Sequence, residues 1–354
     1  MNHYRIAVIP GDGVGKEVVP EGIRAIRMAG EVTGRYTIET TEYPWSCEWY
    51  LEHGEMMPAD GIDRLRDSHA IYLGAVGFPG VPDHVSLWGL LLPIRFGFDQ
   101  FVNKRPVRLF EGIEGPLRGR GPDDIDFICI RENTEGEYSG LGGRTRAGTP
   151  DEVVIQTSLF TRRGTERVIR YAFELARGRK KRLVSATKSN ALNYSMVFWD
   201  EVTRAVAADF PDVEVSTMHV DALSARFVLA PQLLDVVVAS NLFGDILTDL
   251  GGALQGSLGL PASANIDPSG RNPSMFEPVH GSAPGRAGKG TANPMAAIWA
   301  AAMMLEQLGE AEAARLVIAG LEEVARNGPK TIDLGGSGST RDVGREVERL
   351  IQAS

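Results

Sequence analysis

Two aspartates, Asp245 and Asp249, stand four residues apart shortly after the apolar run 236–239. The run is typical of a buried strand, and the spacing places both carboxylates on one face of the following helix, close to its first turn. Two oxygens on one rigid face can hold Mg or Mn and leave coordination positions open for a substrate. The competing interpretation is structural, because aspartate near a helix start is favoured by the helix dipole and the N–H groups there. These residues alone leave both interpretations open.

Further charged residues follow other strand-like runs. Lys188, Asp221 and Arg131 each come at or just after the end of one. The carboxyl ends of strands form the ligand crevice of an open α/β sheet, so these groups are expected to share a site, although each alone could be a surface residue. Arg131 joins Arg95 and Arg105 as guanidinium groups that can clamp carboxylates through two hydrogen bonds. The pattern indicates a small di-acid as ligand.

The elements that must position these residues alternate along the chain. Strand-like runs occur at 6–9, 70–76, 127–130, 183–187, 213–218 and 236–240. Longer amphipathic stretches separate them, which predicts an α/β architecture with a substantial parallel sheet. The stretch 145–161 contains Gly148, Pro150 and a β-rich run, and is expected to form a hairpin or arm. Helices are expected from Met295 onward, and the last should include 343–351.

Whole-chain properties limit the class of protein. At 354 residues the chain exceeds the size of a single core, so two subdomains are expected. The net charge of -9 and pI near 5.3 argue against a general nucleic-acid surface, and the basic run 177–182 is interpreted as a solvated turn. Cys47 and Cys129 lack metal-binding spacing and suit a reducing compartment. With no signal peptide, and with 295–305 too short to cross a bilayer, a soluble cytoplasmic protein is expected.

Two glycine-rich segments come close to known phosphate-binding motifs and fail. The segment 11–16 follows a strand, but Lys16 occupies the third glycine position of the dinucleotide fingerprint. It is not a P-loop either, because Pro10 and Glu17 stand where glycine and Ser or Thr are required. The segment 285–291 fails similarly, since Ala283 replaces the first glycine. A nucleotide is therefore expected to bind in another way.

Several ordered motifs carry a family resemblance over essentially the whole chain. The motifs are Pro10-Gly11-Asp12-Gly13-Val14-Gly15, Arg95 with Arg105-Pro106, Arg131-Glu132-Asn133-Thr134-Glu135-Gly136-Glu137-Tyr138, Lys188-Ser189-Asn190, Asn241-Leu242-Phe243-Gly244-Asp245 with Asp249, and Glu277-Pro278-Val279-His280-Gly281-Ser282-Ala283-Pro284. The sequence resembles the metal-dependent decarboxylating dehydrogenases of 2-hydroxy acids, which include isocitrate, isopropylmalate, D-malate and tartrate dehydrogenases.

The resemblance implies an α/β, isopropylmalate dehydrogenase-like fold of two domains with a largely parallel sheet, and not a Rossmann fold. Residues 1–100 and 256–354 would form the cofactor-side domain. Residues 101–255 would form the substrate and dimerisation domain. An arm near 145–161 would clasp the partner subunit of a homodimer.

It also implies a role for each polar residue noted above. Mn or Mg would be held by Asp245, Asp249 and Asp221 of the partner subunit, with a monovalent cation such as K as an additional candidate. Lys188, also from the partner subunit, would act in removing the proton of the substrate hydroxyl, and Tyr138 would protonate the enolate left after CO2 loss. The substrate carboxylates would be bound by Arg95, Arg105 and Arg131.

The cofactor implied is NAD. Its binding residues would be Glu277, His280, Gly281, Ser282, Ala283, Arg286 and Asn293. NAD-using relatives commonly have an aspartate after the Gly-Ser-Ala-Pro segment, where this chain has Gly285 and Arg286. Arg286 could receive a 2′-phosphate, yet the Lys-Tyr pair of NADP-using isocitrate relatives is absent too. NAD is expected to be preferred with weaker discrimination than usual.

Substrate choice rests on the segment 86–94. Isocitrate enzymes have serine and asparagine where this chain has Gly89 and Leu91, which disfavours a tricarboxylate. Trp88 stands where isopropylmalate enzymes usually have an acidic residue, and it suggests a smaller pocket. Trp88 and Leu91 are thus expected to contact substrate, and D-malate (to pyruvate and CO2) or tartrate is favoured. An isopropylmalate dehydrogenase-like enzyme and a noncatalytic regulatory subunit remain the alternatives.

Overall fold

The computed structural model describes residues 1–354, which divide into two compact units. Unit 1 comprises Met1–Gln100, Arg108–Pro122 and Gly252–Ser354, and unit 2 comprises Phe101–Val107 and Asp123–Gly251. Compared with the expected boundaries, 108–122 and 252–255 lie with unit 1. Part of the reason is ionic, because Arg108 contacts Glu322 (2.6 Å) and Glu111 contacts Arg326 (2.8 Å), both on a C-terminal helix.

Unit 1 contains a five-stranded part of the β-structure in the order β2-β1-β3-β12-β11. The strands are β1 (Asn2–Gly11), β2 (Tyr36–Glu42), β3 (Ala70–Ala75), β11 (Ala262–Ile266) and β12 (Ser274–Pro278). β1 pairs in parallel with β2 and β3, β3 pairs in parallel with β12, and β11 runs antiparallel to β12. Every residue of β3 is buried, as expected for a strand covered on both faces.

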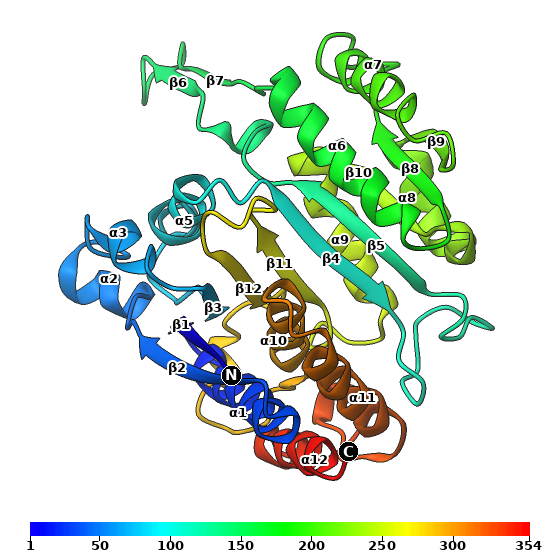
Figure 1. Cartoon of the computed structure of the whole chain (residues 1–354). Coiled ribbons are helices and arrows are strands. Elements are labelled where there is room, and N and C mark those ends of the chain that lie inside the picture. Colours follow the sequence, from blue (N-terminus) through cyan, green and yellow to red (C-terminus); the bar gives the residue numbers. More distant parts are fainter. The chain divides into compact units, whose positions relative to one another are not determined.

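Four long helices pack against one another in unit 1 (Figure 1). They are α1 (Gly15–Thr33), α10 (Met295–Gln307), α11 (Ala311–Asn327) and α12 (Thr340–Gln352). The apolar run 295–305 is entirely buried within α10. None of the helices combines the length and the hydropathy of a membrane span. The shorter helical segments of unit 1 are α2 (Cys47–His53), α3 (Gly61–Leu65), α4 (Asp83–Ser86), a π-helical turn (Leu87–Leu91), α5 (Leu92–Gly97) and the 3₁₀ turns Pro284–Arg286 and Ile332–Leu334.

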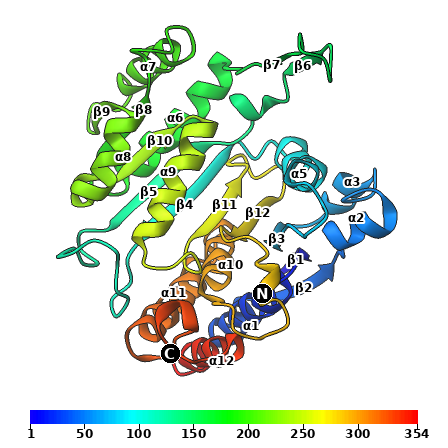
Figure 2. The ribbon, with the colours of Figure 1, turned by 180° about the vertical axis from the view of Figure 1, so that it is seen from behind.

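Unit 2 contains the strand order β4-β5-β10-β8-β9, with β5, β10, β8 and β9 paired in parallel (Figure 2). The strands are β4 (Val102–Arg108), β5 (Asp126–Glu132), β8 (Arg182–Thr187), β9 (Glu214–His219) and β10 (Val236–Ala239). The helices are α6 (Arg162–Arg177), α7 (Ser195–Ala207), α8 (Val220–Leu229) and α9 (Asn241–Leu254), with 3₁₀ turns at Glu137–Ser139 and Pro231–Leu233. α6 packs on β5, β8 and β10. All six strands expected from the sequence are confirmed.

A two-stranded hairpin projects from the rest of unit 2 (Figures 1 and 2). It pairs β6 (Gly142–Thr145) with β7 (Val153–Gln156) in antiparallel register, so the segment is β-structured as expected. Val154 and Ile155 are 68% and 59% exposed. Apolar residues this exposed on a hairpin are typical of a segment that binds another surface.

Two features outside the site agree with the sequence analysis. The basic run 177–182 forms ion pairs with Asp126, Asp212 and Asp235, so its charge is locally balanced. Cys47 and Cys129 are buried free thiols, and burial raises the pKa of each to about 12. A thiol with so high a pKa is a poor nucleophile at neutral pH.

Candidate active site

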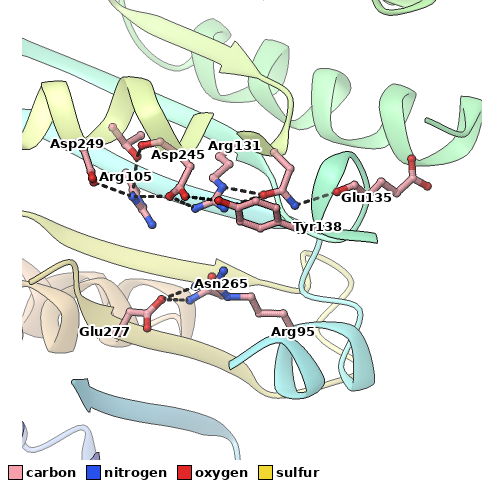
Figure 3. A network of polar contacts seen from close by, with 11 residues as sticks. Arg95, Arg105, Arg131, Glu135, Tyr138, Asp245, Asp249, Asn265 and Glu277 are labelled. Carbon is pink, nitrogen blue, oxygen red and sulfur yellow. Dashed lines mark hydrogen bonds and ion pairs between the residues drawn. The ribbon is translucent and has the colours of Figure 1, made fainter. Parts of the chain in front are cut away.

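The central element of the site is α9, which follows β10 directly. Asn241, Asp245 and Asp249 are spaced four residues apart on it and therefore form one polar stripe. Figure 3 shows Asp245 and Asp249 on this helix. The side chain of Asp245 is 33% exposed and that of Asp249 is 76% exposed. Gly244 lets the stripe approach β5, because a Cβ there would lie 2.6 Å from Cβ and Cγ of Arg131.

Arg131, near the end of β5, is the buried cation that faces this stripe. Its Nη1 donates to Oδ1 of Asp245 at 2.5 Å. Its Nε and Nη2 both donate to Oδ1 of Asn241, at 3.1 and 2.7 Å. Only 2% of Arg131 is exposed, so these contacts fix the plane of its guanidinium group.

Tyr138 reaches the same carboxylate from a 3₁₀ turn, Glu137–Ser139. Its hydroxyl donates to Oδ2 of Asp245 at 2.7 Å, and Cζ of Arg131 lies 5.3 Å from the centre of its ring. Gly136 opens the turn with φ of 73°, a conformation that favours glycine. The acid proposed from the sequence thus lies beside one of the predicted metal ligands.

Arg105, on β4, completes the charge pattern. Its Nη1 donates to Oγ1 of Thr248 at 2.6 Å and lies 3.7 Å from Asp245 and 3.8 Å from Asp249. Two guanidinium groups therefore oppose two carboxylates. Negative substrate groups and a hard cation could each find a partner within this set.

The carboxylates fit part of a metal site. Asp245 and Asp249 offer hard oxygen donors from one helix face, which suits Mg or Mn. In residues 1–354, no three His, Cys, Asp or Glu side chains group so that they could hold a metal ion. Asp221 does not join the pair, so the remaining ligands would have to come from substrate, water or a second chain.

Lys188 and Asp221 form a separate ion pair in unit 2. Nζ of Lys188, just after β8, lies 2.9 Å from Oδ1 of Asp221 in the first turn of α8. The hydrogen bond from Lys188 lowers the pKa of the Asp221 carboxyl. The structure therefore brings together two of the predicted residues, Lys188 from its motif and Asp221 from the end of another strand.

In unit 1, Arg95 belongs to a buried cluster. Its Nη2 lies 3.1 Å from Oε1 of Glu277 on β12, which also accepts from Nδ2 of Asn265 at 2.8 Å (Figure 3). Trp88 and Leu91 lie on the π-helical turn that leads into α5, and Trp88 is 43% exposed. Single π turns frequently occur at functional sites.

Apart from Glu277, which lies on β12, the predicted cofactor residues lie along the segment that follows this strand. Nδ1 of His280 lies 3.0 Å from the Gly281 carbonyl, whereas its Nε2 is shielded and has no hydrogen-bond partner within the chain. Burial lowers the pKa of this imidazole. Ser282 accepts a backbone bond from Val14 at 2.8 Å, and Nδ2 of Asn293 donates to Asp333 at 3.0 Å. A shielded nitrogen without a partner fits a group that binds a ligand.

Sequence reasoning missed two residues that organise the region. The carboxylate of Glu17, in the first turn of α1, accepts from the backbone N–H groups of Gly288 (2.6 Å) and Gly290 (2.9 Å). It therefore anchors the loop that contains Arg286. The second residue is Asn241, to which the sequence motif assigns no role of its own. An acidic residue in a first turn and a helix-initial asparagine both have local explanations, so no sequence signal marked their long-range bonds.

Comparison with known proteins decides the family. A family model described as isocitrate/isopropylmalate dehydrogenase matches residues 5–347. The chain belongs to this family. The resemblance inferred from the motifs is therefore confirmed.

Isocitrate/isopropylmalate dehydrogenase family members with high similarity bear two kinds of name. The chain is 54% identical to D-malate dehydrogenase [decarboxylating] of Escherichia coli K12, with 99% of each chain covered. It is 52% identical to tartrate dehydrogenase/decarboxylase of Pseudomonas putida, with 98% of each covered. Among solved structures, isocitrate dehydrogenase from Methylococcus capsulatus has a TM-score of 0.87 and 33% identity, with 99% of each chain covered. The predicted fold class is confirmed.

Proposed function

We propose that this protein oxidises D-malate or tartrate at the 2-hydroxyl group with NAD and Mn or Mg, and converts D-malate to pyruvate and CO2. The names of the relatives support a decarboxylating dehydrogenase of a hydroxy acid. The structural observation that carries the proposal is the Asp245 carboxylate, which contacts Tyr138 through one oxygen and Arg131 through the other. That arrangement combines a candidate metal ligand, a proton donor and a carboxylate-binding cation.

Each residue of the site has a chemical task in this reaction. A bound divalent metal would lower the pKa of the substrate hydroxyl and stabilise negative charge while CO2 leaves. Arg105 and Arg131 bind the substrate carboxylates, which guanidinium geometry favours. Lys188 of the partner subunit would take the hydroxyl proton, and NAD, when bound, would supply the hydride acceptor. Tyr138 then gives its proton to the carbon from which CO2 has departed.

The surroundings of Trp88 support a small substrate. A Cβ on Gly89 would lie 2.5 Å from Cγ of Met56, which is buried. The serine found there in isocitrate enzymes would therefore require Met56 to move. Leu91 offers no polar group in place of the asparagine. Together these residues disfavour a third substrate carboxylate.

The loop 284–290 supports NAD binding with modest discrimination. Gly285 has open space around the position of a Cβ, so the missing aspartate is not excluded by packing. Arg286 is exposed and available to a 2′-phosphate. We expect NAD to be preferred, NADP to be tolerated, and K to be a candidate activating cation.

We further propose a homodimer with shared active sites. The exposed apolar side chains of β7 and the separation of Asp221 from the Asp245–Asp249 pair support it. A second chain would supply the third carboxylate and Lys188. In this proposal unit 1 binds the cofactor and unit 2 forms the dimer.

A substrate panel tests the function. Purified protein with Mn or Mg should reduce NAD and release CO2 with D-malate or a tartrate isomer, and a chelator should abolish the reaction. Isocitrate and 3-isopropylmalate should react at least about tenfold less efficiently, the discrimination that a misplaced methylene or an unmatched polar group typically costs. Preference for 3-isopropylmalate would favour the isopropylmalate-like alternative. No turnover with any of these acids would favour the regulatory alternative.

A further inference from the structure

We infer that Asn241 is a positioning residue that sets two reacting groups at once through one side-chain amide. The inference rests on the proposed function, because Arg131 and Tyr138 take their tasks from it. Asn241 is 1% exposed and begins α9, four residues before Asp245. A residue so buried does not need a polar side chain for contact with solvent. Its amide group instead makes hydrogen bonds within the site.

The oxygen of the amide controls Arg131. Oδ1 accepts from Nε and Nη2 together, so the bond pair holds one edge of the guanidinium plane. Oδ1 of Asp245 holds Nη1. One hydrogen bond would leave the guanidinium plane free to rotate about that bond. Acceptors on both Asn241 and Asp245 fix the plane. Substrate carboxylate binding depends on that plane because the preferred geometry is planar and bidentate.

The nitrogen of the same amide controls the turn that carries Tyr138. Nδ2 donates to the backbone carbonyl of Glu135 at 3.0 Å. The next residue, Gly136, has φ of 73°, and a Cβ there would lie 3.1 Å from Cβ of Asn241. The turn therefore lies against the Asn241 side chain and is bonded to it. Tyr138 follows three residues after the bonded carbonyl.

Only an amide satisfies both requirements at this position. The guanidinium group needs an acceptor, and the Glu135 carbonyl needs a donor. Aspartate supplies the acceptor and would oppose the carbonyl with a second oxygen. Alanine supplies neither group. The two substitutions therefore separate the two roles, and Gln307→Glu, an exposed amide-to-acid change on α10, is the matched control for added charge.

The first test needs no turnover. In the ligand-free protein, amide hydrogen exchange of peptides covering 133–140 should quicken in Asn241→Ala and in Asn241→Asp, and remain unchanged in Gln307→Glu. Calorimetric binding of D-malate in the presence of Mn and absence of NAD should weaken by about tenfold or more in Asn241→Ala, the effect of losing bonds to a charged group. It should stay within about threefold of wild type in Asn241→Asp, which keeps the acceptor.

The second test separates positioning from a general structural role. Formation of pyruvate from added oxaloacetate should slow about tenfold or more in both variants, because Tyr138, which donates its proton after CO2 has left, loses its position. In a Tyr138→Phe background Asn241→Asp, which keeps the acceptor for Arg131, should have little further effect, since residues that act as a unit are non-additive. An equal loss in both backgrounds, or unchanged exchange at 133–140, overturns the inference.

The failure of the proposed function would be recognised separately. In that case the wild type itself would neither oxidise D-malate nor decarboxylate oxaloacetate. The exchange measurement would still report whether Asn241 holds the Tyr138 turn. If Asn241→Ala unfolds, Asn241→Asp, which preserves size, decides alone. In this variant D-malate binding should stay near that of wild type, whereas pyruvate formation should fall.

Discussion

Asp245 and Asp249 offer a matched pair for testing the metal site. Asp245→Asn and Asp249→Asn each remove one charge from a candidate ligand and preserve shape. Loss of a mere supporting group around a metal costs about 10- to 100-fold in affinity, so loss of a charged ligand should cost at least about tenfold in either variant. Turnover should fall in both, and a higher Mn concentration should restore part of it.

Stability should distinguish the two variants. Asp245 faces buried Arg131 at 2.5 Å, whereas Asp249, 76% exposed, has a contact with Arg105 at 3.8 Å. A hydrogen bond to a charged group contributes about 1.5–3 kcal/mol. The larger cost of breaking a fully buried pair does not apply, because Asp245 is one-third exposed and Asn241 still binds Arg131. An exposed pair contributes at most about 1 kcal/mol.

The assay combines melting temperature with Mn affinity. For folding units of roughly 150–250 residues, 1 kcal/mol shifts Tm by about 2–4 °C. Metal-free Asp245→Asn should therefore melt about 3–12 °C below wild type, and Asp249→Asn at most about 4 °C below it. Mn titration followed by electron paramagnetic resonance should show weakened binding in both. Unaltered Mn affinity in either variant would refute the assignment of that ligand, and equal losses of Tm would refute the analysis of the ion pairs.

Three further outcomes are expected. Mixed under subunit exchange, inactive Lys188→Ala and inactive Tyr138→Phe subunits should regain activity, because each heterodimer would rebuild one intact site; no recovery in demonstrated heterodimers would place each site within one subunit. Gly285→Asp, which open space permits, should raise the NAD:NADP ratio of kcat/KM by repelling the 2′-phosphate, and an unchanged ratio would mean that selection lies elsewhere. Because burial lowers the pKa of His280, the unfolded chain binds more protons below about pH 6.5, so stability should fall as pH drops through that range. Thermal melts at roughly pH 7.5 and 5.5 should show a smaller difference in His280→Gln, and an equal difference would assign the effect to other groups.

The sequence predicted six strands of the two units and the hairpin, and missed β2, β4, β11 and β12. β10 is a run of valines and alanine, and buried parallel strands have this composition. β4 contains Lys104, Arg105 and Pro106, and β11 is made mainly of small residues, so neither has the expected pattern. β11 packs against α10, and Val107 of β4 lies against Gly251 of α9, and a local pattern cannot report such packing.

For the candidate site, the sequence predicted the spacing of residues within one helix but not the contacts between distant segments. The spacing of Asp245 and Asp249 follows from helix geometry, so the sequence alone placed them on one face. The bonds from Asn241 to Arg131 and Glu135 cross about 106–110 positions of the chain. No periodicity encodes such contacts. A positioning residue such as Asn241 is therefore not identified from the sequence alone.

The charge of the site fits joint binding of the proposed metal and substrate. Arg105 and Arg131 oppose Asp245 and Asp249, so the four side chains together are neutral. A divalent cation alone would introduce two positive charges beside two guanidinium groups, and a dicarboxylate alone would introduce two negative charges beside two carboxylates. Either addition is unfavourable where the surroundings are only partly solvated. Added together, the two charges cancel, and each ligand contacts side chains of opposite sign. A site built from balanced arginines and aspartates thus favours a metal and a dicarboxylate jointly over either one alone.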